Sequence, residues 1–138
     1  MLDRNGVIAE ARSWIGTPWV ASGAAKGVGA NCLGFFAGVA RNVGLGTLAD
    51  AFVPYGGFAL PPKPADLLRG LCRHLVRTPW PQARPADLLL FDLGDGLRHV
   101  AMLTAPQTII HAYQSKGRVV EHRLIWTAHS AYRIPGLD

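Results

Sequence analysis

The types and settings of three residues make them candidates for nucleophilic catalysis: Cys32, His99 and His111. A cysteine thiolate attacks carbonyl carbons, and a histidine can take the thiol proton and later give it to a leaving amine. A second polar group that orients the histidine completes such a site. These residue types therefore indicate a hydrolase of amide bonds, provided that the fold brings them together.

Cys32 follows Asn31 and a stretch rich in small residues, 21–30. Because Asn is a favoured N-cap, we expect a helix to begin at Cys32 and to run to about Gly44. In the first turn of a helix, the dipole and the free N–H groups stabilise a thiolate, and the same N–H groups can stabilise an oxyanion. The alternative is a small buried residue without chemistry, which is the commoner role of a lone cysteine.

His99 opens a short apolar run directly after a Gly/Asp turn, which places it at the rim of a predicted sheet. His111 lies in the run 108–113, where strand alternation puts it on one face with Ile109 and Tyr113. We expect His99 to be the general base and His111 to hold its ring in the working tautomer. The alternatives are a surface histidine beside a turn for His99 and a core histidine bonded to a backbone carbonyl for His111.

The elements that must position these residues fall into a helical first part and a strand-rich second part. An amphipathic helix is expected from the cap Asp3 to a stop at Gly16, with Ile15 beside its buried face. A second helix is expected over residues 65–76, opened by Pro64. Residues 45–64 indicate an irregular excursion that shapes a groove or a docking face, and residues 79–85 a loop between the two parts.

Short apolar or alternating runs separated by turn residues predict an antiparallel meander in the second part. Helices followed by a sheet indicate the α+β class, and the length of 138 residues fits a single domain, residues 1–138. The expected strands cover residues 88–91, 99–103, 108–113, 119–124 and 132–134.

The net charge and the lengths of the apolar runs limit the kinds of partner that the protein is expected to bind. The net charge is +5, but the basic residues are scattered, so no nucleic-acid partner is expected; a basic face suits an anionic polymer such as cell wall. No apolar run approaches the ~20 residues that span a bilayer, so no membrane insertion is expected. The polar N-terminus shows no secretory signal, so we expect synthesis in the cytoplasm and delivery by another route.

The remaining cysteine and histidines are expected to be structural or peripheral. Cys72, on the second helix, is expected in the protein core. His74 and His122 are expected on the surface, and His129 in a loop. Two cysteines make neither a disulfide scaffold nor a paired CxxC zinc motif. No metal or organic cofactor is expected, with a zinc site from Cys32, His99 and His111 as the minor alternative.

The chain resembles the NlpC/P60 cysteine peptidases almost end to end. The resemblance centres on Asn31-Cys32-Leu33-Gly34. In this segment, Cys32-Leu33-Gly34 stands where most of the family has Cys-Ser-Gly. Cys-Leu-Gly is typical of the small peptidases encoded with phage tails and gene transfer agents, to which the chain is most similar. Two positions depart from the family: Asn31 replaces the common Asp, and Trp19 replaces the common Tyr. The matching segments are 11–19, 27–34, 86–91, 99–102, 110–113 and 131–136.

This resemblance implies a papain-like fold and a triad of Cys32, His99 and His111. It implies as substrate the stem peptides of bacterial peptidoglycan, often cut between D-γ-glutamate and a diamino acid. The family's Tyr hydroxyl helps the oxyanion site, and the indole N–H of Trp19 is a donor at that position. The two altered residues, Trp19 and Asn31, are therefore the implied oxyanion or substrate-binding residues. Phage-like tail and hub proteins are the implied partners, and a particle tail the implied location. The rival interpretation is a structural tail component that keeps the fold without turnover.

Overall fold

The structure of the protein, a computed structural model, describes residues 2–52 and 63–137. Most helices precede a six-stranded antiparallel sheet, which confirms the predicted α+β class. The helices are α1 (Arg4–Arg12), α2 (Cys32–Asn42), α3 (Gly46–Ala51) and α4 (Pro64–His74), with short 3₁₀ turns η1 (Trp80–Gln82) and η2 (Gln114–Lys116). The strands are β1 (Ala24–Ala25), β2 (Gly29–Ala30), β3 (Val76–Thr78), β4 (Leu88–Asp92), β5 (Leu97–Ala105), β6 (Thr108–Tyr113), β7 (Arg118–Arg123) and β8 (Ser130–Arg133).

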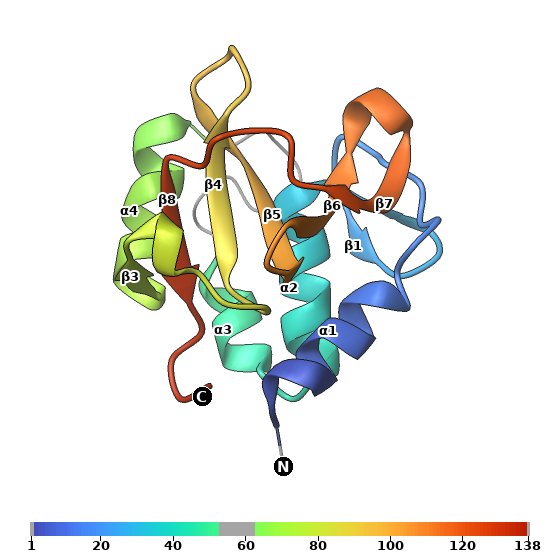
Figure 1. Cartoon of the computed structure of the whole chain (residues 1–138). Coiled ribbons are helices and arrows are strands. Elements are labelled where there is room, and N and C mark those ends of the chain that lie inside the picture. Colours follow the sequence, from blue (N-terminus) through green and yellow to red (C-terminus); the bar gives the residue numbers. More distant parts are fainter. Residues whose placement is uncertain (1, 53–62, 138) are drawn as a thin grey trace.

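The large sheet has the strand order β3-β8-β4-β5-β6-β7 (Figure 1). Strands β4 to β7 form the predicted antiparallel meander. The prediction did not foresee that β8 leaves the meander and pairs with β4 on its other side. Strand β3 then pairs with β8 at the sheet edge, although Val76 was assigned to a helix. The helix ends earlier because Leu75 already has an extended backbone.

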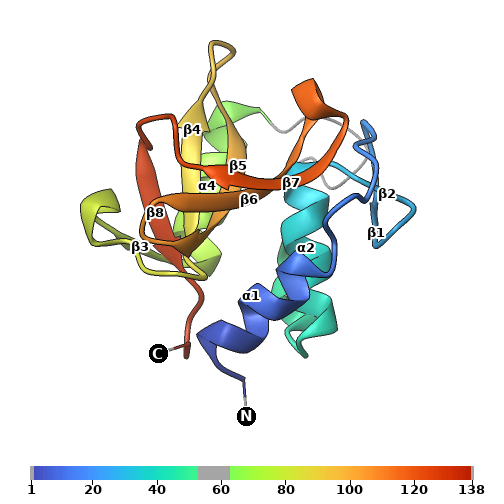
Figure 2. The ribbon, with the colours of Figure 1, turned by 45° about the vertical axis from the view of Figure 1, so that its right-hand side comes forward.

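Both faces of the sheet are covered. One face, with Leu88, Leu90, Val100 and Met102, packs with helices α1, α2 and α4 in the main core. Figure 2 shows α1 and α2 side by side on one flank of the sheet, and α4 behind β4 and β5. The other face forms a second cluster with the segments before β4 and before β8. This double burial explains why the strands are nearly continuous apolar runs rather than clean alternations.

Helix α1 begins at the predicted cap, where the Asp3 carboxylate accepts a hydrogen bond from the Gly6 N–H at 2.7 Å. It buries Val7, Ile8 and Ala11, as the spacing predicts. The helix ends at Arg12, however, and the chain turns, so that Ile15 is 51% exposed. The expectation that Ile15 lies beside the buried face is therefore wrong.

Two further elements correct the predictions. Residues 46–51 form helix α3 rather than part of an irregular excursion, and residues 53–62 of that predicted excursion lie outside the described residues. The predicted loop 79–85 contains the short turn η1. The small-residue loop 21–30 holds the two-stranded hairpin of β1 and β2, which lies against α2.

Two side-chain placements on α4 are also corrected. Cys72 is exposed and not in the core, because the buried positions of α4 are Leu67, Gly70 and Leu71 and the next residue turns about 100° away from them. His74 was expected on the surface, but its ring is partly buried and packs edge-on against Phe52 at 5.7 Å between centroids. His129 lies exposed in a loop, as predicted.

Gly34 allows the hairpin to approach the start of α2. A Cβ atom at Gly34 would overlap the carbonyl oxygen of Gly23 and lie 3.0 Å from Asn31 Oδ1. We therefore expect Gly34→Ala to lower the free energy of unfolding by about 1–3 kcal/mol through overpacking. Urea denaturation measures the effect. In Gly46→Ala the new Cβ atom meets only Arg41 Nη1, at 3.8 Å, so this control should be at least as stable as the parent. Equal stability of both variants would contradict the proposed contact.

Candidate active site

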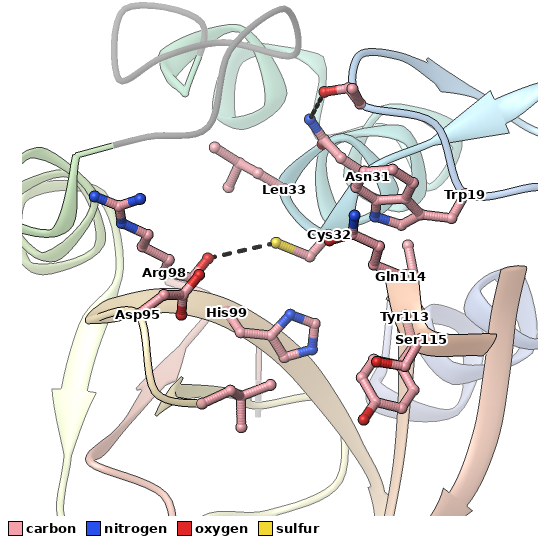
Figure 3. A pocket seen from close by; sticks show the side chains of 13 residues that line it. Trp19, Asn31, Cys32, Leu33, Asp95, Arg98, His99, Tyr113, Gln114 and Ser115 are labelled. Carbon is pink, nitrogen blue, oxygen red and sulfur yellow. Dashed lines mark hydrogen bonds between the residues drawn. The ribbon is translucent and has the colours of Figure 1, made fainter. Parts of the chain in front are cut away.

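Cys32 is the first residue of α2, as predicted. The side chain of Asn31 caps the helix, with its Oδ1 accepting a hydrogen bond from the Gly34 N–H at 2.7 Å. The same amide donates to the carbonyl oxygen of Ala21 at 3.2 Å, which anchors the preceding loop (Figure 3). The start of the helix, and with it the position of Cys32, is therefore fixed by Asn31.

The sulfur of Cys32 lies where β5 and β6 separate. Their pairing ends at the pair Met102 and Ile110, and beyond that point the backbone of β5 faces the thiol instead of β6. Cys32 Sγ donates to the carbonyl oxygen of Arg98 at 3.7 Å (Figure 3). Burial raises the pKa of the Cys32 thiol, and the backbone N–H groups of Val100, Leu33 and Cys32 itself oppose that rise. These backbone donors thus favour the thiolate form of Cys32 against the effect of burial.

His99 and His111 are in direct contact, as the sequence predicts. His99 Nε2 lies 2.6 Å from His111 Nδ1, and the His111 ring is fully buried. Since Nε2 of His99 is occupied in this way, Nδ1 is the nitrogen left to face the thiol. Figure 3 shows the His99 ring with one nitrogen on the side of Cys32. The structure thus brings Cys32 and His99 to one cavity and sets His111 behind His99.

Both histidine rings favour the neutral form. Burial lowers the pKa of His99 to about 4, opposed by the charge of Asp95 and helped by His122. Burial, together with His99 and His122, lowers the pKa of His111 to about 2. At neutral pH the site therefore holds a neutral thiol and a neutral imidazole, so that His99 is free to accept a proton during attack.

These shifts predict acid sensitivity. The unfolded chain takes up protons below about pH 6.5 while the two folded rings do not, so stability falls as the pH drops through 6.5 toward 4. Between pH 7 and pH 5 we expect a loss on the order of 2 kcal/mol for each ring. Urea titrations at both pH values measure this loss, and His111→Phe should make the pH dependence shallower. Pure carboxylate titration would instead leave stability flat above pH 5.

The cavity in front of Cys32 has a volume of about 400 Å³. Trp19 and Gln114 lie on one side of Cys32, and Asp95 and Arg98 on the other (Figure 3). The cavity is lined by Trp19, Ala21, Asn31, Cys32, Leu33, Leu93, Asp95, Arg98, His99, Ala112, Tyr113, Gln114 and Ser115. Its mixed charged, amide and aromatic lining suits a polar peptide.

The two residues expected beside the nucleophile both line this cavity. The Trp19 backbone is held by a hydrogen bond from its N–H to the Gly117 carbonyl at 2.8 Å, and its indole borders the cavity. An oxyanion role for Trp19 stays a prediction. The Asn31 amide serves the helix cap and the Ala21 carbonyl, and a further role toward substrate also stays a prediction.

Sequence reasoning missed three residues near the site. Asp95 lines the cavity from the turn before β5, and Arg98 lines it from the start of β5 itself. His122, expected on the surface, is partly buried, and its Nε2 lies 2.8 Å from His111 Nε2. The turn between β6 and β7 could have revealed the position of His122, because the turn sets the register of the two strands. With Tyr113 opposite Arg118, His122 lies on the same face of the sheet as His111.

The histidine rings bond to one another through their nitrogens and do not converge on a shared point. Among residues 2–52 and 63–137, no group of three or more His, Cys, Asp or Glu side chains is arranged to hold a metal ion. Within the same ranges, no helix combines the length and apolar character needed to cross a bilayer.

Comparison with known proteins gives a clear result for the fold. No family profile and no curated protein sequence matches the chain. Among solved structures, the NlpC/p60 domain of the peptidoglycan hydrolase SagA matches with a TM-score of 0.70 and 23% identity, over 96% of this chain and 100% of that chain. The chain has the NlpC/P60 fold.

Two other structures give the same result. The P60 domain of an antigen from M. avium subspecies paratuberculosis has a TM-score of 0.65 and 23% identity, covering 95% of this chain and 93% of its own. The peptidoglycan hydrolase RipB from Mycobacterium tuberculosis has a TM-score of 0.62 and 21% identity, covering 95% of this chain and 64% of its own. The predicted NlpC/P60 fold is therefore confirmed, whereas similarity to the small phage-tail peptidases stays a prediction.

Proposed function

We propose that the protein is a cysteine peptidase that hydrolyses amide bonds in the stem peptides of bacterial peptidoglycan. One observation carries this proposal: in an NlpC/P60 fold, Cys32 begins a helix and shares a cavity with His99, whose far nitrogen is held by His111. SagA and RipB, which share the fold, are peptidoglycan hydrolases. The excess of basic residues suits an anionic polymer.

The chemistry begins with a rotation of the Cys32 side chain from the Arg98 carbonyl toward Nδ1 of His99. His99 takes the thiol proton as sulfur attacks the amide carbonyl carbon, and the backbone N–H of Cys32 stabilises the oxyanion, with the indole N–H of Trp19 as a second donor. When the C–N bond breaks, His99 gives its proton to the leaving amine. His99 then takes a proton from water, whose oxygen attacks the thioester and releases a carboxylic acid and the thiol.

A second candidate is a structural tail component that keeps the fold and has lost turnover. The observation that favours it is the thiol itself, which is directed at the Arg98 carbonyl and not at His99 (Figure 3). Hydrogen bonds between catalytic groups are often long or poorly aligned before substrate binds, so this thiol direction is compatible with an enzyme. We therefore prefer the cysteine peptidase to the structural component.

A substrate-like thiol probe separates the two candidates. The probe is a peptidyl acyloxymethyl ketone with a γ-D-glutamyl residue, used at neutral pH on the Cys72→Ser variant because Cys72 is exposed. If the protein is an enzyme, the probe should label Cys32 at least about 100-fold faster than it labels a free thiol. This factor is the lower end of the range for general-base catalysis. His99→Ala should remove that advantage. Labelling at the rate of a free thiol in both proteins would support the structural component.

We also propose the bond between D-γ-glutamate and the diamino acid as the point of cleavage, and a phage-like tail as the place where the protein meets the wall. Both rest on the resemblance centred on Cys32-Leu33-Gly34. Mass spectrometry of purified phage-like particles from the producing cells tests the location. Detection beside tail and hub proteins is expected, and absence from intact particles would contradict it.

A further inference from the structure

Three histidines lie in a diagonal row across neighbouring strands. His99 is on β5, His111 on β6 and His122 on β7, and each ring touches the next. Strand β7 pairs Val120 with His111 and His122 with Ile109, so that His122 is the diagonal neighbour of His111 on the same face. The register of the sheet therefore builds a row of imidazoles leading away from the cavity.

Hydrogen bonds run through this row without a break. His99 Nε2 meets His111 Nδ1 at 2.6 Å, and His111 Nε2 meets His122 Nε2 at 2.8 Å. His122 Nδ1 lies 2.8 Å from the carbonyl oxygen of Arg123. Each ring nitrogen in the row, apart from Nδ1 of His99, thus has a partner.

The carbonyl at the end decides where the protons lie. A carbonyl oxygen only accepts, so Nδ1 of His122 carries a proton and, in the neutral ring, Nε2 is the acceptor. His111 must then donate from Nε2 and accept at Nδ1. His99 in turn donates from Nε2 and has an unprotonated Nδ1, the nitrogen on the side of Cys32. Burial favours the neutral forms of His99 and His111, which are the forms that this chain of bonds requires of them.

We propose that His122 is a positioning residue that, through His111, makes Nδ1 the basic nitrogen of His99. The inference rests on the proposed function, because it assigns His99 as the general base. His122 does not line the cavity, so it acts through His111 and not on substrate. The Trp126 ring packs edge-on against all three histidines, with centroids 5.6–6.2 Å away, and holds the row together.

Nuclear magnetic resonance of the ¹⁵N-labelled protein reads the tautomers directly, without substrate. Long-range ¹⁵N–¹H correlations distinguish protonated from unprotonated ring nitrogens. We expect protons on Nε2 of His99 and His111 and on Nδ1 of His122. A His111 ring protonated on Nδ1 in the wild type would overturn the proposal, whether or not the protein hydrolyses peptidoglycan.

Two substitutions then test the role of His122. In His122→Phe the buried His111 Nε2–H loses its acceptor, so His111 should shift its proton to Nδ1 and force the proton of His99 onto its own Nδ1. We expect kcat to fall by about 10–100-fold, as for other groups that orient a catalytic ligand, with KM unchanged. His122→Gln offers an amide oxygen to His111 and should restore both the tautomers and most of kcat.

His129→Phe is the matched control, because His129 lies exposed in a loop outside the cavity lining, and its ring bonds to the neighbouring Ser130. It should change neither tautomers nor kcat. If the wild type is active and His122→Phe keeps wild-type kcat and tautomers, the positioning role is wrong while the proposed function stands. If the wild type is inactive but shows the expected tautomers, the proposed function fails and the proton arrangement stands. Should His122→Phe not fold, the wild-type spectrum and His122→Gln still decide.

Discussion

Replacing Cys32 with alanine is expected to reduce the release of peptides from purified peptidoglycan by at least about 10⁴-fold, because loss of a nucleophile removes the acyl-transfer route altogether. The start of α2 and the β5 backbone position the Cys32 sulfur at the cavity. The measurement is the rate at which new amino groups appear in a peptidoglycan suspension.

The second cysteine supplies the matched control. Cys72 is exposed on α4 and lines no part of the cavity, so Cys72→Ser should keep the wild-type rate. Circular dichroism should show both variants folded, since Cys32 is only partly buried and alanine fits a helix start. Wild-type hydrolysis by Cys32→Ala would remove the cysteine-peptidase assignment.

Replacing Asp87 with alanine is expected to cause the largest loss of stability, about 3–5 kcal/mol, as for a buried ion pair that loses one partner. Asp87 is fully buried directly before β4. It accepts from Arg4 Nη1 at 2.9 Å, from the Arg84 N–H at 2.8 Å and from Arg133 Nη2 at 3.3 Å. Removal of the carboxylate leaves these donors facing an apolar side chain at the junction of α1, β4 and β8.

Urea denaturation of Asp87→Ala and of the wild type measures this loss of stability. Asp66→Ala is the control, because Asp66 forms an exposed pair with Arg69 one helical turn away and should cost less than about 0.5 kcal/mol. Since β4 pairs directly with the strand that carries His99, we also expect Asp87→Ala to lower activity near its unfolding transition. A loss below 1 kcal/mol would show that the buried network contributes little.

The residues that sequence reasoning placed correctly are those whose signals are local. Asn is a favoured N-cap residue, so the position of Cys32 in the first turn could be predicted from the adjacent Asn31. The strands of His99 and His111 followed from short apolar runs, and their order along the chain matched the family resemblance. Local patterns thus sufficed for the central residues of the candidate site.

The residues that were misplaced depend on distant pairing. His122 has the alternating surroundings of a surface strand residue, and only the β6–β7 register turns it toward His111. Val76 continues a helical pattern, but it pairs with Arg133 at the far end of the chain. These two pairings are set by tertiary packing, which single-residue patterns do not encode. Cys72 is a different case, because its exposure follows from helical periodicity: it lies about 100° around α4 from the buried leucine before it.

The most direct test of the central claim is mass analysis of the fragments released from purified peptidoglycan by the wild-type protein and by Cys32→Ala. A peptidase with Cys32 as nucleophile and His99 as base should release stem-peptide fragments. These should end in a new γ-D-glutamyl carboxylate or begin with a new diamino-acid amine, and Cys32→Ala should release none. Cleavage in the glycan strand, or the same fragments from both proteins, would contradict the account.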